Sequence, residues 1–158
     1  MVSPELLRRF PFFAGFTDKQ LKELAMAGQE NTLAKDETLA TEGQTADKFY
    51  ILVDGQVEIS VDTDETGTTR VPLSTLTAGE PIGWSALVEP HIFTSTVRAT
   101  RPCKYIAFEG RALQDMEKDH HFCSLLLKKL VQVVSRRLKD TRVQLLSFSA
   151  KPREKQWP

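Results

Sequence analysis

The chain of 158 residues is predicted to be mainly β: an antiparallel β-roll or jelly roll (double-stranded β-helix) with N-terminal helices and two C-terminal helices. Three observations predict this order. Apolar residues follow a helical period near the N-terminus, alternate with a period of two from residue 31 to 108, and return to a helical period after Glu109. About eight short β segments with glycine turns between them are typical of a jelly roll or sandwich.

The N-terminal segment predicts two helices. Residues 4–10 form a short helical pattern, and an apolar turn follows at residues 12–16. Thr17-Asp18-Lys19-Gln20 fits a capping box, in which the Thr hydroxyl and the Gln side chain each bind the other residue's backbone N–H. The helix from Asp18 to about Gly28 is expected to bury three residues: Leu21, Leu24 and Ala25.

The central segment alternates between apolar and polar residues, as half-buried strands do. Its apolar positions include Leu33, Leu39, Phe49, Ile51, Val53, Val57, Ile59 and Val61. Turn signals separate the strands at residues 35–36, 42–43, 54–55 and 64–67. Asp54-Gly55 between two apolar runs predicts a β-hairpin. Later strands are expected at residues 69–76, 94–101 and 103–108.

After Glu109 the sequence predicts a short helix over residues 110–118 and a long one over residues 120–148. The long helix carries a heptad seam: Leu127, Val131, Val134, Leu138, Thr141, Leu145 and Phe148. Such a seam favours a homodimer through this helix, and the alternative is that it docks wholly on the β-roll. Residues 1–150 are expected to form one domain, and residues 151–158 a disordered tail.

Composition argues against several classes of function. Lys plus Arg and Asp plus Glu number 21 each, so no bulk charge attracts nucleic acid or an anionic membrane. Cys103 and Cys123 are predicted to be reduced thiols, and no signal peptide or membrane span is apparent, which favours a cytoplasmic location. Only one histidine, His91, lies in the β segment, so no metal site and no catalytic residues are expected, and the protein is not expected to be an enzyme.

One stretch carries the most functional information. A glycine turn at residues 79–83 leads into a short helical segment and loop, and a strand begins near Phe93. This is the layout of a phosphate-binding cassette, because a glycine lets the backbone approach an anion and a helix start offers unpaired N–H groups. The candidate ligand-binding residues here are Gly83, Trp84, Ser85, Ala86, Leu87, Phe93, Thr94 and Ser95.

The chain resembles the cyclic-nucleotide-binding domains, of the type found in the catabolite activator protein and in kinase regulatory subunits. The resemblance rests on Glu42-Gly43 followed by Phe49-Tyr50-Ile51 and by Gly55-Gln56-Val57, on residues 78–83, and on Thr96-Val97-Arg98-Ala99. It covers roughly residues 10–148 and implies a regulatory domain with a cyclic nucleotide such as cAMP as its ligand.

The cassette departs from the family at two places. In the family, a Glu after the glycine holds the ribose 2'-hydroxyl and an Arg about ten residues later pairs with the phosphate; here these positions carry Trp84 and Phe93. Arg98 falls on the opposite strand face from position 93, and His91 is the nearest group that could carry positive charge. Weak or altered ligand binding is therefore expected, and a less charged ligand is an open alternative.

The long helix adds one candidate. Ser135–Thr141 resembles the dimerisation helix of the catabolite activator protein, where a Thr reaches the adenine base, so Thr141 is a further candidate ligand residue. Two functions remain open: a bacterial-type regulator that signals to a partner protein, and a ligand-free scaffold whose pocket is closed by Trp84 and Phe93. Since few residues follow the seam, no helix-turn-helix and no direct DNA binding are expected.

Overall fold

The computed structural model describes residues 1–66 and 68–149. Its helical elements are α1 (Pro4–Arg8), η1 (Pro11–Phe13), α2 (Asp18–Ala27), η2 (Trp84–Leu87), α3 (Gly110–Met116) and α4 (His120–Ser149). Its strands are β1 (Gly28–Leu33), β2 (Thr38–Ala40), β3 (Lys48–Asp54), β4 (Gln56–Asp62), β5 (Arg70–Thr77), β6 (Pro81–Ile82), β7 (Thr96–Ala99) and β8 (Cys103–Glu109). The predicted tail and Gly67 of the predicted turn lie outside the described residues.

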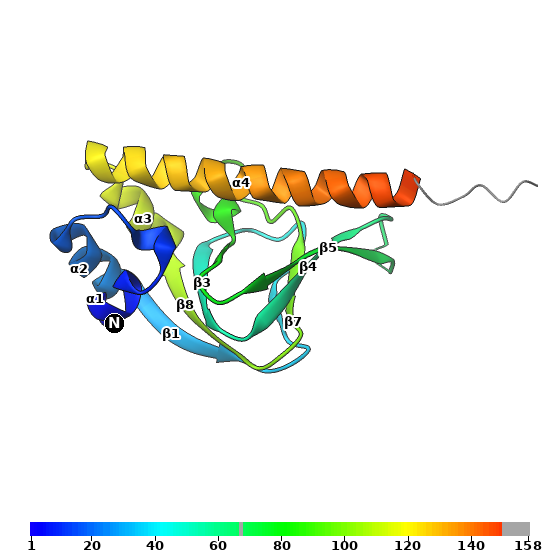
Figure 1. Ribbon diagram of the computed structural model, residues 1–158, viewed down its shortest axis with the longest axis horizontal. Helices are drawn as coiled ribbons and strands as arrows, with labels where there is room; N and C mark the ends of the chain where they lie inside the picture. The colour runs from blue at the N-terminus through cyan, green and yellow to red at the C-terminus, as the bar shows by residue number, and fades with distance from the viewer. Residues whose placement is uncertain (67, 150–158) are drawn as a thin grey trace, which may run out of the picture.

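The strands form two four-stranded antiparallel sheets, ordered β1-β8-β3-β6 and β2-β7-β4-β5. The expected β-roll with helices at both chain ends is therefore confirmed (Figure 1). The N-terminal helices and α3 gather at one end of the roll, and α4 runs along its top toward β4 and β5 (Figure 1). Among the described residues, no helix is long and apolar enough to cross a membrane.

The capping box at α2 is present and extends into a larger polar cluster. Thr17 Oγ1 accepts from the Gln20 N–H at 3.2 Å, and Gln20 Oε1 accepts from the Thr17 N–H at 2.9 Å. The Gln20 amide, which is buried, also donates to Asp119 Oδ2 at 2.8 Å. Asp119 Oδ1 accepts from the His121 N–H at 3.0 Å, so one carboxylate both caps α4 and links it to α2.

The prediction of a β-hairpin at Asp54-Gly55 is wrong. β3 and β4 lie in different sheets, so Gly55 turns a corner between the sheets rather than joining paired strands. Gly55 has φ 101°, and an added Cβ would lie 2.5 Å from the Pro102 carbonyl oxygen. The β3–β4 corner is thus stacked against the β7–β8 corner, a long-range contact that a local Asp-Gly signal cannot reveal.

Helix α4 docks on the rest of the domain through a face that is different from the predicted heptad seam. Its buried residues are Phe122, Leu126, Leu130 and Val133. The seam residues Leu127, Val131, Val134, Leu138 and Leu145 are 39–65% exposed, and the side chain of Phe148 lies outside the described residues. The alternative in which the seam docks wholly on the roll is therefore wrong, and the homodimer stays a prediction.

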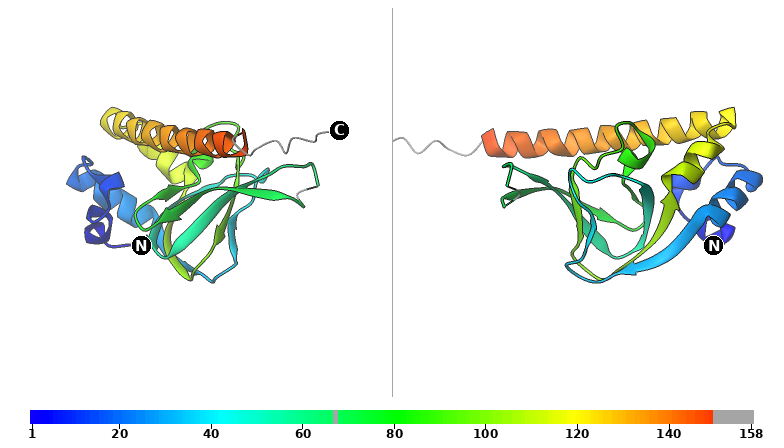
Figure 2. Two further views of the ribbon diagram at one scale, coloured as in Figure 1. Left: turned by 45° about the vertical axis from the view of Figure 1, so that its right-hand side comes forward. Right: turned by 180° about the vertical axis from the view of Figure 1, so that it is seen from behind.

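The C-terminal half of α4 is less buried than its N-terminal half. Beyond Val133 no described residue of α4 is fully buried. This half contacts β5, and the β4–β5 hairpin lies beneath it in the right-hand view of Figure 2.

Candidate ligand-binding cavity

A cavity of about 350 Å³ lies between η2, the loop before β7, the β2-β7-β4-β5 sheet and α4. Ligand pockets typically begin at roughly 300 Å³, so the space suits a small molecule. Most of its lining is apolar: Ala40, Ile59, Val61, Leu73, Pro81, Ile82, Trp84, Phe93, Val97, Val134 and Leu138. The polar lining consists of Ser74, Ser85, Thr94, Ser95, Thr141 and Arg137.

The cavity brings together most of the candidate residues. Its lining includes Gly83, Trp84, Ser85, Phe93, Thr94, Ser95 and Thr141. Ala86 and Leu87 lie outside the lining. Because η2 is a single 3-10 turn, its far end faces α3, and the Ala86 carbonyl accepts from Gln114 Nε2 at 3.3 Å.

Gly83 and Phe93 form one corner of the cavity. Gly83 adopts φ 80°, a left-handed conformation that favours glycine. A Cβ at Gly83 would lie 3.0 Å from the Lys48 carbonyl oxygen and 3.4 Å from Phe93 Cε1. Phe93 is only 8% exposed. An aromatic ring therefore packs at the position where the resemblance places the phosphate-binding arginine.

The other candidate cations of the cassette lie away from the cavity. Arg98 on β7 is exposed and does not line it, in agreement with strand alternation. His91 does not line it either, and its Nδ1 lies 3.2 Å from the Ser85 carbonyl oxygen. The possibility that His91 supplies a positive charge to the pocket is therefore not supported by the geometry.

Arg137 lines the cavity, although it lies outside the predicted heptad seam of the long helix. Its side chain is half-buried, and its Nη2 donates to the Pro81 carbonyl at 3.1 Å. Burial lowers the pKa of Arg137, an effect that Glu80 and Asp140 partly offset. Arg137 lies four residues after Val133, on the face that docks, but the sequence pattern favours the other apolar face of this helix.

Two hydroxyl groups in the lining differ in their hydrogen bonding. Thr141 Oγ1 donates to the Arg137 carbonyl at 2.8 Å, so this hydroxyl is engaged by the helix backbone. Ser74 Oγ is buried and has no hydrogen-bond partner among the described residues. The pairing register of β4 and β5 shifts beside Ser74, between Ile59 and Ser60, which lets the adjacent Leu73 and Ser74 both reach the cavity.

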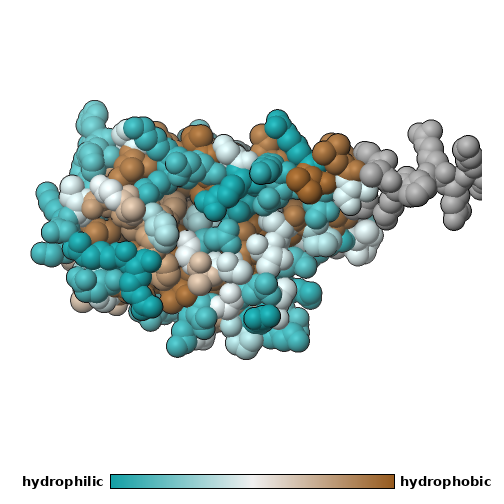
Figure 3. All heavy atoms as spheres, in the orientation of Figure 1, coloured by the Kyte–Doolittle hydropathy of each residue, from teal (hydrophilic) through white to brown (hydrophobic). Residues whose placement is uncertain are grey.

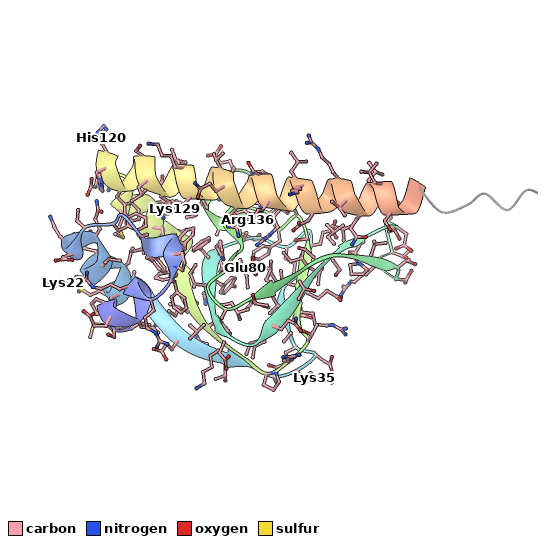
Figure 4. All side chains as sticks on the ribbon, in the orientation of Figure 1. Lys22, Lys35, Glu80, His120, Lys129 and Arg136 are labelled. Atoms are coloured by element: carbon pink, nitrogen blue, oxygen red, sulfur yellow. The ribbon has the colours of Figure 1, made fainter. Side chains whose placement is uncertain are left out.

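The neighbouring arginine has a different environment. Arg136 Nη1 lies 4.0 Å from Glu80 Oε1, and its side chain is 60% exposed. Figure 4 shows Arg136 on α4 with Glu80 beneath it. Arg136 does not line the cavity, whereas Arg137 does.

Within residues 1–66 and 68–149, no group of three or more His, Cys, Asp or Glu side chains is placed to hold a metal ion.

Comparison with known proteins identifies relatives with the same domain. The family model for the cyclic nucleotide-binding domain matches residues 30–120. The human Popeye domain-containing protein 3 is 29% identical over 113 residues, which span 70% of this chain and 38% of that protein. The chain thus covers well under half of this curated relative.

Solved structures show the same fold. A putative cyclic nucleotide-binding protein from Geobacter metallireducens is 30% identical, with a TM-score of 0.77 over 87% of this chain and 99% of that one. The N-terminal domain of a transcriptional regulator from Streptomyces coelicolor is 31% identical, with a TM-score of 0.65 over 93% and 99% of the two chains. The similarity therefore extends beyond the β-roll to the flanking helices.

Proposed function

Because this chain belongs to the cyclic nucleotide-binding domain family, we propose that it is a non-catalytic regulatory module. A small ligand binds in the cavity under α4, and the helix passes the binding event to a partner protein. The observation that carries this proposal is the cavity itself: a space of about 350 Å³ persists at the cassette and is closed on one side by α4. Ligand occupancy and helix position are therefore physically linked.

The proposal includes weak binding of cAMP. A hydrogen bond to a charged group contributes about 1.5–3 kcal/mol, and a bidentate Arg–phosphate pair has two. Without it we expect an affinity at least about 100-fold below that of a site with both charged residues. Backbone N–H groups near Gly83 and the hydroxyls of Ser85 and Ser95 are left to bind the nucleotide.

Calorimetric titration of the full chain with cAMP, and with cGMP for comparison, tests this proposal. Ser95→Trp fills the cavity, and Ile92→Trp adds the same side chain at an exposed position that does not line it. Micromolar or weaker binding that Ser95→Trp abolishes and Ile92→Trp retains supports the regulator. No heat and no thermal shift at millimolar nucleotide excludes these nucleotides as ligands.

The second candidate is a ligand-free scaffold, which the packing of Phe93 against Gly83 favours. In that case the cavity binds no small molecule, and interaction depends on the outer surface alone. A cavity-filling Ser95→Trp variant that keeps the native affinity for a partner protein supports the scaffold; loss of ligand-dependent partner binding supports the regulator.

We also propose that the exposed seam of α4 forms a homodimer. Figure 3 shows apolar side chains, in brown, exposed along α4 between hydrophilic ones. Leu127 and Val131 are 51% and 64% exposed, and both lie outside the cavity lining. Sedimentation equilibrium is expected to give a dimer for the native chain and for the control Lys128→Glu, and a monomer for Leu127→Glu with Val131→Glu. A native monomer at high micromolar concentration contradicts the proposal.

A further inference from the structure

We propose that the cavity takes an amphipathic organic anion: a molecule with an apolar body and one anionic group, which Arg137 and Ser74 bind. This inference rests on the proposed function, because it requires that the cavity binds a small ligand. It differs from the family arrangement in where the anion is held. The cation comes from α4 and not from the loop that precedes β7.

The walls of the cavity favour an apolar ligand body. Eleven of its lining side chains are apolar, including both cassette aromatics, Trp84 and Phe93. Among the described residues, no Asp or Glu side chain lines the cavity. A ribose with free hydroxyl groups therefore finds no carboxylate to accept its hydrogen bonds, and only neutral groups such as serine and threonine hydroxyls are left to pair with it. An aromatic or branched apolar body needs no such partners.

One formal charge faces this apolar space. Arg137 is the charged residue of the lining, and no carboxylate of the described residues lies within 4.0 Å of its guanidinium, the limit for an ion pair. Its guanidinium makes one hydrogen bond, to the Pro81 carbonyl, within the described part of the chain. Since a guanidinium has five N–H donors in a planar fork, most of its capacity suits a carboxylate, sulfonate or phosphate ester.

Ser74 supplies a second, independent observation. Its Oγ is buried without a hydrogen-bond partner among the described residues, although buried hydroxyl groups are ordinarily paired. Ser74 belongs to β5, over which α4 packs, so it lines the cavity from the wall opposite the helix that carries Arg137. An anionic group on the ligand offers several acceptor oxygens, and one that reaches Ser74 Oγ would give this hydroxyl the partner that it lacks.

The single charged residue in the lining also limits how many charges the ligand can carry. A single cation in a mostly apolar cavity balances one negative charge, and a second charge on the ligand would be buried unpaired. Monoanions are therefore preferred over dianions. The same single charge also separates anionic from uncharged ligands of equal shape, which makes the inference measurable.

Two probes of matched shape test it: 8-anilinonaphthalene-1-sulfonate, and its uncharged parent N-phenyl-1-naphthylamine. Both are titrated by fluorescence into the full chain. We expect Arg137→Gln to weaken the anionic probe by about tenfold or more and the uncharged probe by less than about threefold, since one charged hydrogen-bonded contact is lost. Ser74→Ala is expected to weaken the anionic probe by a few-fold.

Controls separate the inference from a structural effect and from the proposed function. Arg136→Gln removes a neighbouring cation outside the cavity and is expected to change neither affinity, and Arg137→Lys is expected to restore part of the anionic binding. The inference is overturned if Arg137→Gln weakens the binding of both probes equally. It is also overturned if this variant leaves the binding of the anionic probe unchanged. Probe binding that persists unchanged in the cavity-filling Ser95→Trp variant lies outside the cavity and overturns the inference, whereas the proposed function is decided separately by the nucleotide titration.

Discussion

Restoring the two missing charges is the sharpest test of whether the cassette backbone is intact. The change is Trp84→Glu with Phe93→Arg, which places a carboxylate after Gly83 and a guanidinium at the corner that the Phe93 ring fills. Phe93 Cε1 lies 3.4 Å from the position of a Gly83 Cβ, so an arginine stem at residue 93 starts beside the glycine of the cassette. The variant is therefore expected to bind cAMP more tightly than the native chain.

The magnitude follows from the hydrogen bonds that the variant adds and from the side-chain entropy that it loses. Two charged hydrogen bonds contribute about 3–6 kcal/mol, and ordering the arginine costs about 1–2 kcal/mol. The net gain of about 1–5 kcal/mol corresponds to an affinity increase of about 5- to 4000-fold. Against this, Phe93 is nearly buried, and replacing its ring by a partly apolar arginine stem costs about 2–3 kcal/mol of folding free energy.

Calorimetry with cAMP, paired with a thermal melt, measures both effects. Trp84→Glu with Ile92→Arg is the matched control, because it has the same charges but places the arginine at an exposed position outside the cavity. The expected result is a lower melting temperature, a cooperative transition and tighter cAMP binding for the Phe93 variant alone. A folded Phe93 variant that binds cAMP no better than its control refutes the reasoning and shows that the loop geometry differs from the family.

Three further predictions concern stability. Ser74→Ala removes an unpaired buried hydroxyl and should raise the melting temperature of the ligand-free chain by about 2–4 °C, for a gain of about 1 kcal/mol; a lower melting temperature in calorimetry contradicts this. Gly55→Ala places a Cβ 2.5 Å from the Pro102 carbonyl oxygen and should lower the free energy of unfolding, measured in urea, by more than about 4 kcal/mol. Gly43→Ala, which has open space around it, should lower it by about 1 kcal/mol. Hydrogen bonds from the Gln20 side chain and the α4 backbone lower the pKa of Asp119 below its ordinary value. Its contribution to the folding free energy is therefore complete above about pH 5 and is lost as pH falls through that lowered pKa. Asp119→Asn should flatten the decline of stability with falling pH, and an unchanged slope argues against the role of Asp119 in joining α2 to α4.

The helices and the order of elements could be predicted because their signals are local. The capping box at Thr17 and Gln20 and the return of a helical period after Glu109 each depend on residues within a few turns of one another. The corner at Gly55 could not, because an Asp-Gly pair has the same local signature in a hairpin and in a crossing between sheets. Only the position of Pro102, far along the chain, distinguishes the two.

Part of the cavity lining could be predicted for a similar reason. Residues near Gly83 and Phe93 are neighbours in sequence, and the cavity lining includes them. Arg137 and Ser74 reach the same cavity from α4 and β5, and their role depends on the phase of a long helix and on an irregular strand pairing. The apolar positions of α4 support two overlapping faces, and the sequence alone favours the one that the structure leaves exposed.

The way α4 is held amplifies small displacements along the helix. Its first half is fixed by buried residues that end at Val133, while the remaining residues to Ser149 lie over the cavity and hairpin, and none of those described is fully buried. At 1.5 Å per residue this outer arm is about 24 Å long, so a tilt of roughly 5° about Val133 moves its tip by about 2 Å. Arg137 lies one turn beyond that pivot. Under the proposed function, a ligand anion that displaces Arg137 by a small distance therefore moves the exposed seam near Leu145 by a larger one.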